Sequence, residues 1–274
     1  MKKHKICKIL LVILAIFLCV AFYELLGICV AYKKQPEVSN TTKKETKNGS
    51  WNECSENTER AVIIEKNPEA LLQRVRLIKN AKKEIILSTF AFQSDESGKL
   101  ILGALHDAAD RGVHIRLLVD GMESWIDMEG NPYFYGLSSH ENVEIKLYNK
   151  ANPLKPWKMM GRMHDKYLIA DGKRYILGGR NTYNYFLGDF PGHKNYDRDV
   201  LVVCDEPEKE NSVNQLSEYF ETIWNQEDSG YFHNNKKLAN RKSVKNAVLE
   251  LQNSYQKYFE ENKERICETD YTDE

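Results

Sequence analysis

From residue 59 onward, short apolar runs that suit β-strands alternate with longer segments of helical periodicity. Strand-like runs lie at residues 84–90, 113–120, 143–149 and 198–205, and helical segments at 67–83, 97–112 and 206–227. Pro68 near the start of the first helical segment and Gly112 at the end of the second are typical helix boundaries. This alternation predicts an α/β sandwich with a largely central sheet flanked by helices.

The N-terminal region carries an apolar run of 24 residues, 9–32, in which Glu24 is the single charge. As a helix this run would be about 36 Å long, against about 30 Å for the hydrocarbon core of a bilayer. It exceeds the roughly 7–15 apolar residues of a signal peptide, so an uncleaved membrane anchor at residues 1–33 is preferred over a cleaved signal. The short basic tail before it favours a cytoplasmic N-terminus and a folded domain on the extracytoplasmic side of the membrane.

Three further regions follow the anchor. Residues 34–58 are polar and rich in turn-forming residues, which predicts a linker, and residues 59–232 hold the folded domain. Residues 233–274 are highly charged but carry a helical apolar stripe through Val244, Val248, Leu251, Tyr255 and Tyr258. That stripe implies a partner surface, which is the domain itself, another subunit or a missing segment.

Charge and cysteine content narrow the class of protein. The net charge is −1 and the isoelectric point is near 6.7, which argues against a protein that coats nucleic acid through bulk charge. The six cysteines include no CxxC pair, so no metal finger is indicated. Three of them lie in or beside the N-terminal apolar run, and the odd number left indicates no disulfide framework. Cys204 ends an apolar strand and is expected in the core.

Residues 163–181, "MHDKYLIADGKRYILGGRN", concentrate chemically active side chains around one predicted hairpin. On an extended strand His164 and Lys166 share a face, and Asp171-Gly172 has the composition of a tight turn. The return strand then brings Gly178-Gly179 and Asn181 back beside the pair. An imidazole, an ammonium and an amide that converge on one point suit a tetrahedral oxyanion, with phosphate the obvious candidate.

This stretch resembles the phospholipase D superfamily. The family pattern H-x-K-x4-D-x6-G-(S or G)-x-N is matched at six fixed positions: His164, Lys166, Asp171, Gly178, Gly179 and Asn181. The surrounding residues look most like the first half of bacterial cardiolipin synthases, and the resemblance covers roughly residues 59–232.

The resemblance implies a role for each residue. His164 would attack phosphorus and form a phosphohistidine, while Lys166 and Asn181 would hold the non-bridging oxygens. Asp197 is similar in position to the carboxylate that orients the histidine in this family, with Asp199 as the alternative. Gly178 and Gly179 would let the backbone approach the substrate, and Asp171 is expected to be structural as much as chemical. No metal or other cofactor is implied.

Family enzymes use two such motifs, because a second histidine must protonate the leaving alcohol. Neither His193 nor His233 begins a second motif. The chain would therefore dimerise or form the first half of a longer protein, and the cardiolipin synthase likeness together with the C-terminal apolar stripe favours the second.

Three functions remain open from the sequence. The first is phosphatidyl transfer on a phosphatidylglycerol-like membrane lipid, or its hydrolysis to phosphatidic acid. The second is a homodimeric nuclease, which the near-neutral charge disfavours, and the third is an inactive half that binds lipid. The segment 152–163 mixes Lys155, Trp157, Lys158 and Arg162, and is either an interfacial loop or an ordinary one.

Overall fold

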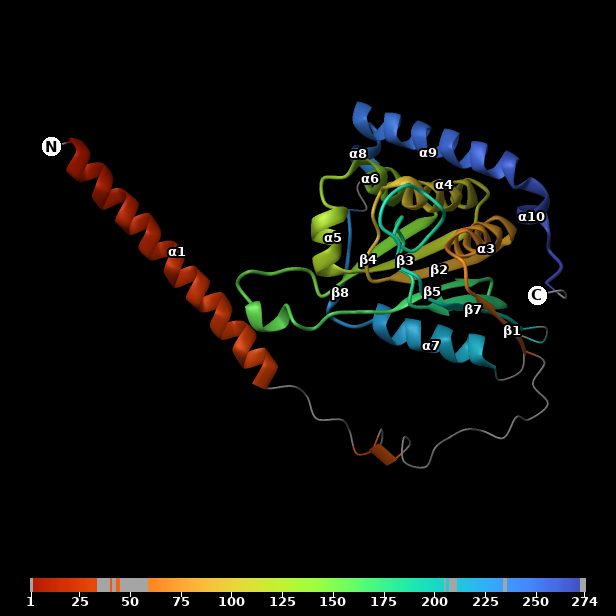
Figure 1. Ribbon diagram of the computed structural model, residues 1–274, viewed down its shortest axis with the longest axis horizontal. Coiled ribbons are helices and arrows are strands. Elements are labelled where there is room, and N and C mark those ends of the chain that lie inside the picture. Colours follow the sequence, from red (N-terminus) through yellow and green to blue (C-terminus); the bar gives the residue numbers. More distant parts are fainter. Residues whose placement is uncertain are drawn as a thin grey trace. The chain divides into compact units, whose positions relative to one another are not determined.

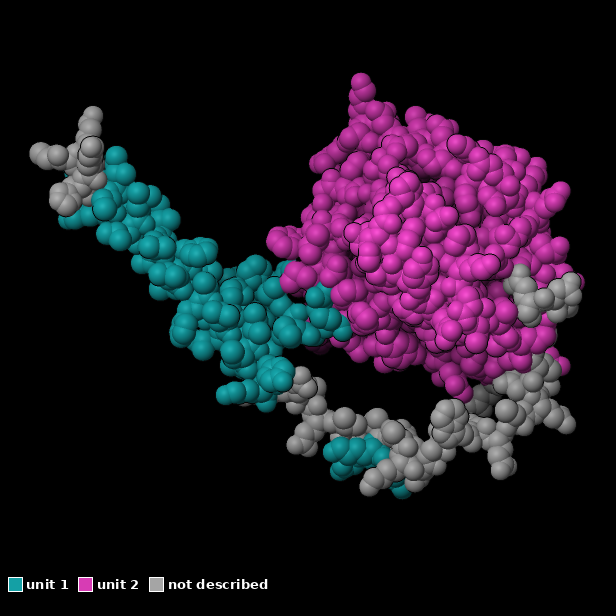
Figure 2. Space-filling view, in the orientation of Figure 1, with its two compact units in different colours: residues 1–55, 151–162 teal, residues 56–150, 163–274 magenta. Residues whose placement is uncertain are grey.

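The computed structural model describes residues 2–33, 40, 43–44, 59–204, 206, 211–233 and 236–271. The expected linker at residues 34–58 lies outside the described residues, except for positions 40, 43 and 44. The chain divides into two compact units, coloured separately in Figure 2. One unit comprises residues 1–55 and 151–162, and the other comprises residues 56–150 and 163–274.

The first unit is built on α1 (Lys2–Lys33), one long helix (Figure 1). By length and composition, its residues 5–33 are sufficient to cross a membrane, in agreement with the expected anchor. A short 3-10 helix, η1 (Pro156–Lys158), contacts α1 within this unit. The Tyr23 hydroxyl donates to the carbonyl oxygen of Leu154 at 2.9 Å, and Gly27 leaves room for the ring of Pro156. The loop whose role was left open is therefore packed against the candidate membrane helix.

The second unit is organised by one mixed sheet in the order β1-β7-β6-β5-β2-β3-β4-β8. The strands are β1 (Glu59–Ile64), β2 (Glu84–Thr89), β3 (His114–Asp120), β4 (Val143–Tyr148), β5 (Lys166–Ala170), β6 (Arg174–Gly178), β7 (Asp199–Cys204) and β8 (Ser229–Tyr231). The pairs β2–β3 and β3–β4 are parallel and all the others are antiparallel. The predicted central sheet is confirmed.

Helices cover both faces of the sheet (Figure 1). The helices of this unit are α3 (Asn67–Asn80), α4 (Glu96–Asp110), α5 (Gly121–Asp127), α6 (Pro132–Ser138), α7 (Ser212–Trp224), α8 (Lys236–Ala239), α9 (Lys242–Glu261) and α10 (Lys263–Cys267). Helices α3 and α4 lie on one face and α7 lies on the other (Figure 1). Side chains of β2 alternate accordingly, with Ile85 and Leu87 in the core under α3 and α4 and Ile86 in the core under α7. Cys204 lies in the core under α7, as expected.

Local sequence signals account for the helix boundaries on the α3–α4 face. Pro68 lies in the first turn of α3, where its missing N–H costs nothing. Asp95 caps α4 by accepting a hydrogen bond from the N–H of Gly98. Gly112, at φ +88°, turns the chain out of α4 in a conformation that favours glycine. These boundaries fix where β2 and β3 begin, and hence where their carboxyl ends lie.

The C-terminal helix belongs to the folded domain. Val244, Leu251 and Tyr255 of α9 are buried in the main core, and α9 packs on α4 and α6 as an outer layer (Figure 1). Gly103 of α4 lies so close to α9 that a Cβ there would overlap the Leu251 carbonyl. The expected boundary at residue 232 is therefore not a structural one. The partner of the apolar stripe is the domain itself.

Candidate active site

The motif residues gather where four neighbouring strands end in one row. Lys166 at the start of β5 pairs with Thr89 at the end of β2. Gly178 at the end of β6 pairs with Asp199 at the start of β7. The predicted hairpin joins β5 to β6 through Asp171-Gly172, which have φ of +55° and +63°. Positive φ at both positions is the conformation of a type I′ turn.

His164 lies just before β5 and is exposed, whereas the sequence placed it on the strand. The backbone just before His164 is held by β3, because the N–H of Met163 donates to the carboxylate of Asp120 at 3.0 Å. The Phe90 ring packs against the imidazole in an edge-to-face arrangement, with ring centroids 4.6 Å apart. Within the described part of the chain the imidazole has no hydrogen-bond partner. Its nitrogens are therefore available to a substrate.

Lys166 begins β5, two residues after His164, and is only 5% exposed. Its Nζ donates one hydrogen bond, to the carbonyl oxygen of His164 at 2.8 Å, and lies 5.2 Å from the centre of the Phe90 ring. Burial lowers the pKa of Lys166, and the charges of Asp165 and Asp197 oppose that shift. An ammonium carries three N–H donors, so two remain for a ligand among the described contacts.

Asn181 is held by the segment that follows β2. Its Oδ1 accepts a hydrogen bond from the N–H of Ala91 at 3.2 Å, which leaves the amide NH2 group as the donor. The N–H of Thr182 donates to the Ala91 carbonyl at 3.0 Å, and the N–H of Gln93 donates to the Thr182 carbonyl. Burial raises the pKa of Tyr183, and a hydrogen bond to Asn181 opposes the shift. Asn181 is thus fixed at the same end of the sheet as Lys166.

The two glycines make room for carboxylates of the neighbouring strand. A Cβ at Gly178 would overlap the Asp199 carboxylate, and a Cβ at Gly179 would overlap the Asp197 carboxylate. In the structure these glycines make room for Asp199 at the start of β7 and for Asp197 just before it. Their approach to the substrate stays a prediction.

Asp197 and Asp199 have different surroundings. Asp197 is exposed, accepts a hydrogen bond from the N–H of Arg198, and acts electrostatically on Lys166. No hydrogen bond joins Asp197 to the His164 ring in the described structure, so the orienting role is not observed. Asp199 is fully buried, and its Oδ2 lies 2.9 Å from Arg74 and 3.2 Å from Arg180. These contacts give Asp199 a structural role, in place of the orienting role that was expected of it as the alternative to Asp197.

Arg180 is a residue that the sequence analysis missed. It is 1% exposed and donates to the carbonyl oxygens of Ile64 and Glu65 and to Asn67 Oδ1. Burial lowers its pKa, while Asp199 acts to raise it. The side chain ties the loop that carries Asn181 to the end of β1. The available signal in the sequence was an arginine at position 180, between the motif residues Gly179 and Asn181.

Phe90 was also missed as a site residue, although it ends the strand-like run 84–90. An aromatic residue at the carboxyl end of a predicted buried strand could have indicated a residue that lines the active site.

Asp171 lies at the far end of β5 from Lys166. Its carboxylate accepts hydrogen bonds from the N–H groups of Lys82, Lys83 and Glu84, at 2.7 to 3.0 Å. The five residues of β5 separate it from the site by roughly 16 Å at the rise of a strand. The structure therefore gives Asp171 a structural role and removes it from the catalytic group.

A buried ammonium, a fixed amide and an exposed imidazole can together bind a phosphoryl group and attack it. No group of three or more His, Cys, Asp or Glu side chains in the described ranges is arranged to hold a metal ion.

The mixed sheet and this His-x-Lys and Asn arrangement define a phospholipase D-like protein. The family model described as "Cardiolipin synthase, PLD-like domain" matches residues 74–224. The chain therefore belongs to the phospholipase D superfamily of enzymes.

Individual relatives are similar over part of their length. An uncharacterized protein of Helicobacter pylori is 30% identical over 72% of this chain and 39% of its own, and cardiolipin synthase C of Escherichia coli is 30% identical over 51% and 31%. The chain spans between about a quarter and two fifths of the length of these curated relatives. The structure of phosphatidylserine synthase from Haemophilus influenzae covers 81% of this chain and 48% of that chain, with a TM-score of 0.51 and 18% identity, and supports the fold alone.

Proposed function

We propose that this chain transfers a phosphatidyl group between a membrane phospholipid and an alcohol through a phosphohistidine at His164. With a second phosphatidylglycerol as the acceptor, the product is a cardiolipin. With water as the acceptor, the same chemistry yields phosphatidic acid.

The observation that carries the proposal is the surroundings of Lys166. A buried ammonium with a single internal hydrogen bond and a lowered pKa is costly unless an anion completes its contacts. Asn181 presents a neutral donor at the same end of the sheet. His164, two residues before Lys166, is exposed. The group that needs two donors and a nucleophile is a phosphodiester.

The chemistry divides into two displacements. His164 forms a P–N bond as the P–O bond to the leaving glycerol breaks, and a second imidazole supplies the proton that glycerol takes. The acceptor hydroxyl then forms a new P–O bond as the P–N bond breaks, and returns its proton to that second imidazole. Lys166 and Asn181 stabilise the charge on the non-bridging oxygens in both steps.

The second imidazole would come from His164 of a second copy or from a further segment of a longer protein. An immunoblot of source cells with an antibody against residues 59–232 separates these sources. A band near 31.9 kDa supports a homodimer, and a band near twice that mass supports a two-motif chain.

A membrane lipid is the preferred substrate because the chain that carries His164 also carries a candidate membrane helix. The segment 151–162 contacts α1, and only Met163 separates it from His164. Leu154 and Trp157 on this segment are 79% and 45% exposed, as suits residues at a headgroup boundary. We place the protein in the cell membrane with one span and the catalytic domain outside.

The test uses the full chain in nanodiscs that contain labelled phosphatidylglycerol. Cardiolipin with free glycerol indicates transfer, phosphatidic acid indicates hydrolysis, and nicking of supercoiled DNA without lipid turnover supports the nuclease alternative. His164→Ala should abolish turnover. His193→Ala, which removes another exposed histidine, is the matched control and should retain it. Lipid turnover that survives His164→Ala would refute the proposal.

A further inference from the structure

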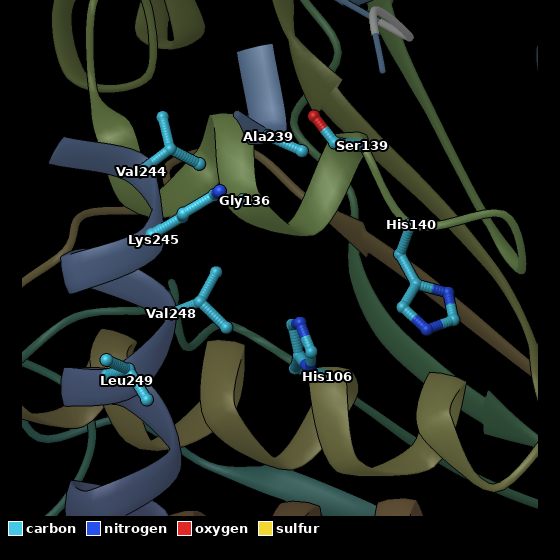
Figure 3. A pocket seen from close by; sticks show the side chains of 9 residues that line it. All are labelled: His106, Gly136, Ser139, His140, Ala239, Val244, Lys245, Val248 and Leu249. Atoms are coloured by element: carbon cyan, nitrogen blue, oxygen red, sulfur yellow. The ribbon is translucent and has the colours of Figure 1, made fainter. Parts of the chain in front are cut away.

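A cavity whose lining includes none of the candidate active-site residues lies where α9 crosses α4 and α6. Its volume is about 430 Å³, within the roughly 300–1,000 Å³ of small-molecule pockets. The lining residues are His106, Gly136, Ser139, His140, Ala239, Val244, Lys245, Val248 and Leu249 (Figure 3). Apolar side chains of α9 form one wall, and His106 projects from α4 into the space (Figure 3).

One carboxylate fixes both histidines of this cavity. Asp110 Oδ2 lies 3.0 Å from His106 Nδ1, and Asp110 Oδ1 lies 3.2 Å from His140 Nε2. The N–H of Asn142 donates to His140 Nδ1 at 3.1 Å, so that nitrogen carries no proton. Because a carboxylate only accepts, His140 donates from Nε2 and His106 donates from Nδ1.

This arrangement leaves His106 Nε2 as a polar atom without a protein partner in the described ranges. The His106 side chain is only 10% exposed and lines the cavity. His106 Nε2 is not among the enclosed, unsatisfied polar atoms of the described chain, so water reaches it, and a ligand that enters the cavity has to offer a polar group in place of that water. Lys245 adds a positive charge at the same cavity.

The walls indicate the rest of the ligand. Val244 is buried and Val248 is half-buried. Leu249 remains 57% exposed although it lines the cavity. Apolar walls with one convergent polar atom suit an amphiphile that places its head on His106 and its chain along α9.

We propose that this cavity binds a single-chain fatty acid, with its carboxyl group on His106 Nε2 and its chain against Val248 and Leu249. A carboxylic acid satisfies Nε2 whichever partner holds the proton, because O–H···N and O⁻···H–N contain the same atoms. Asp110 stabilises the imidazolium in the second arrangement, and Lys245 attracts the carboxylate. This site is independent of the phosphoryl chemistry at His164.

The test measures binding of octanoate to the full chain in phosphatidylcholine nanodiscs by isothermal titration calorimetry, with empty nanodiscs subtracted. Octan-1-ol, which has the same chain without the acid, is the head-group control. We expect one saturable octanoate site and at least tenfold weaker binding of octan-1-ol. Octanoate uptake no greater than that of empty nanodiscs, or equal binding of octan-1-ol, would overturn the proposal.

Two variants test the contacts. Leu249→Asp puts a negative charge on an exposed lining position and should weaken octanoate binding at least tenfold without threatening the fold. Asn246→Asp, an exposed position on α9 outside the cavity lining, is its matched control. His106→Leu should abolish the preference for the acid over the alcohol. Equal effects of the two α9 variants, or an unchanged preference in His106→Leu, would contradict the assignment.

Discussion

Replacement of Lys166 by methionine separates the catalytic role of this side chain from a structural one. Methionine keeps an unbranched apolar chain but removes the ammonium and its donors. Removal of one donor to transition-state charge typically lowers turnover by about 10² to 10³, or roughly 3–4 kcal/mol. Lys166 makes a single internal hydrogen bond, and burial lowers its pKa, so the folded state gains little from the charge. We therefore expect a free energy of unfolding within about 1 kcal/mol of the parent.

The assay pairs phosphatidylglycerol turnover in nanodiscs with thermal unfolding of the same preparations. Lys173→Met is the matched control, because Lys173 is an exposed lysine in the turn of the same hairpin. The control should retain both turnover and stability. The reasoning is refuted if Lys166→Met turns over lipid within threefold of Lys173→Met. It is also refuted if the variant loses activity only through a fall of several kcal/mol in stability, because Lys166 would then be a structural residue.

Other predictions concern pH and the two structural contacts that the sequence left open. Because burial lowers the pKa of Lys166, turnover should begin to fall with rising pH before the ordinary lysine pKa near 10.5 is reached. Over the same pH range the unfolded state binds more protons than the folded state, so the contribution of Lys166 to the free energy of unfolding should rise with pH. Parallel pH series of rate and melting temperature check both signs. Asp171→Asn should lower the free energy of unfolding by about 1–3 kcal/mol in denaturant titrations, with turnover per folded molecule unchanged, because the loss falls on three backbone N–H groups away from the site. Leu251→Ala should cost about 2–5 kcal/mol and unfold α9 together with the sheet in one transition, whereas a separate early transition for α9 would contradict its place in the core.

The fold was largely predictable because local and long-range signals agree. The strand-like run 84–90 and the helical segment 97–112 have clear periodicity and caps, and the structure has β2 and α4 at these positions. The partner of residues 233–274 was not predictable from one sequence. The stripe through Leu251 specifies an apolar surface, but only the folded arrangement of α4 and α6 determines what covers it.

The site was predictable in composition more than in contacts. Spacing alone placed His164, Lys166 and Asn181 at one end of a hairpin, and the structure has Lys166 and Asn181 tied to the same end of β2. The contacts of Asp197 and Asp199 depend on β7 pairing with β6, which spans an intervening loop of twenty residues between their ends. A pattern within one hairpin carries no information about that register.

The fixed spacings of the motif follow from the geometry of the hairpin. Ala170 pairs with Arg174 and Tyr167 pairs with Leu177, so the same register carried one residue further places Gly178 beside Lys166. Four residues between Lys166 and Asp171 and six between Asp171 and Gly178 are the counts that this register requires. A one-residue change would turn the following side chains to the opposite face of the sheet and place a Cβ against the carboxylates of Asp197 and Asp199. The motif therefore combines two requirements, because Asp171 and the glycines set a register that the reactive side chains need but do not themselves enforce.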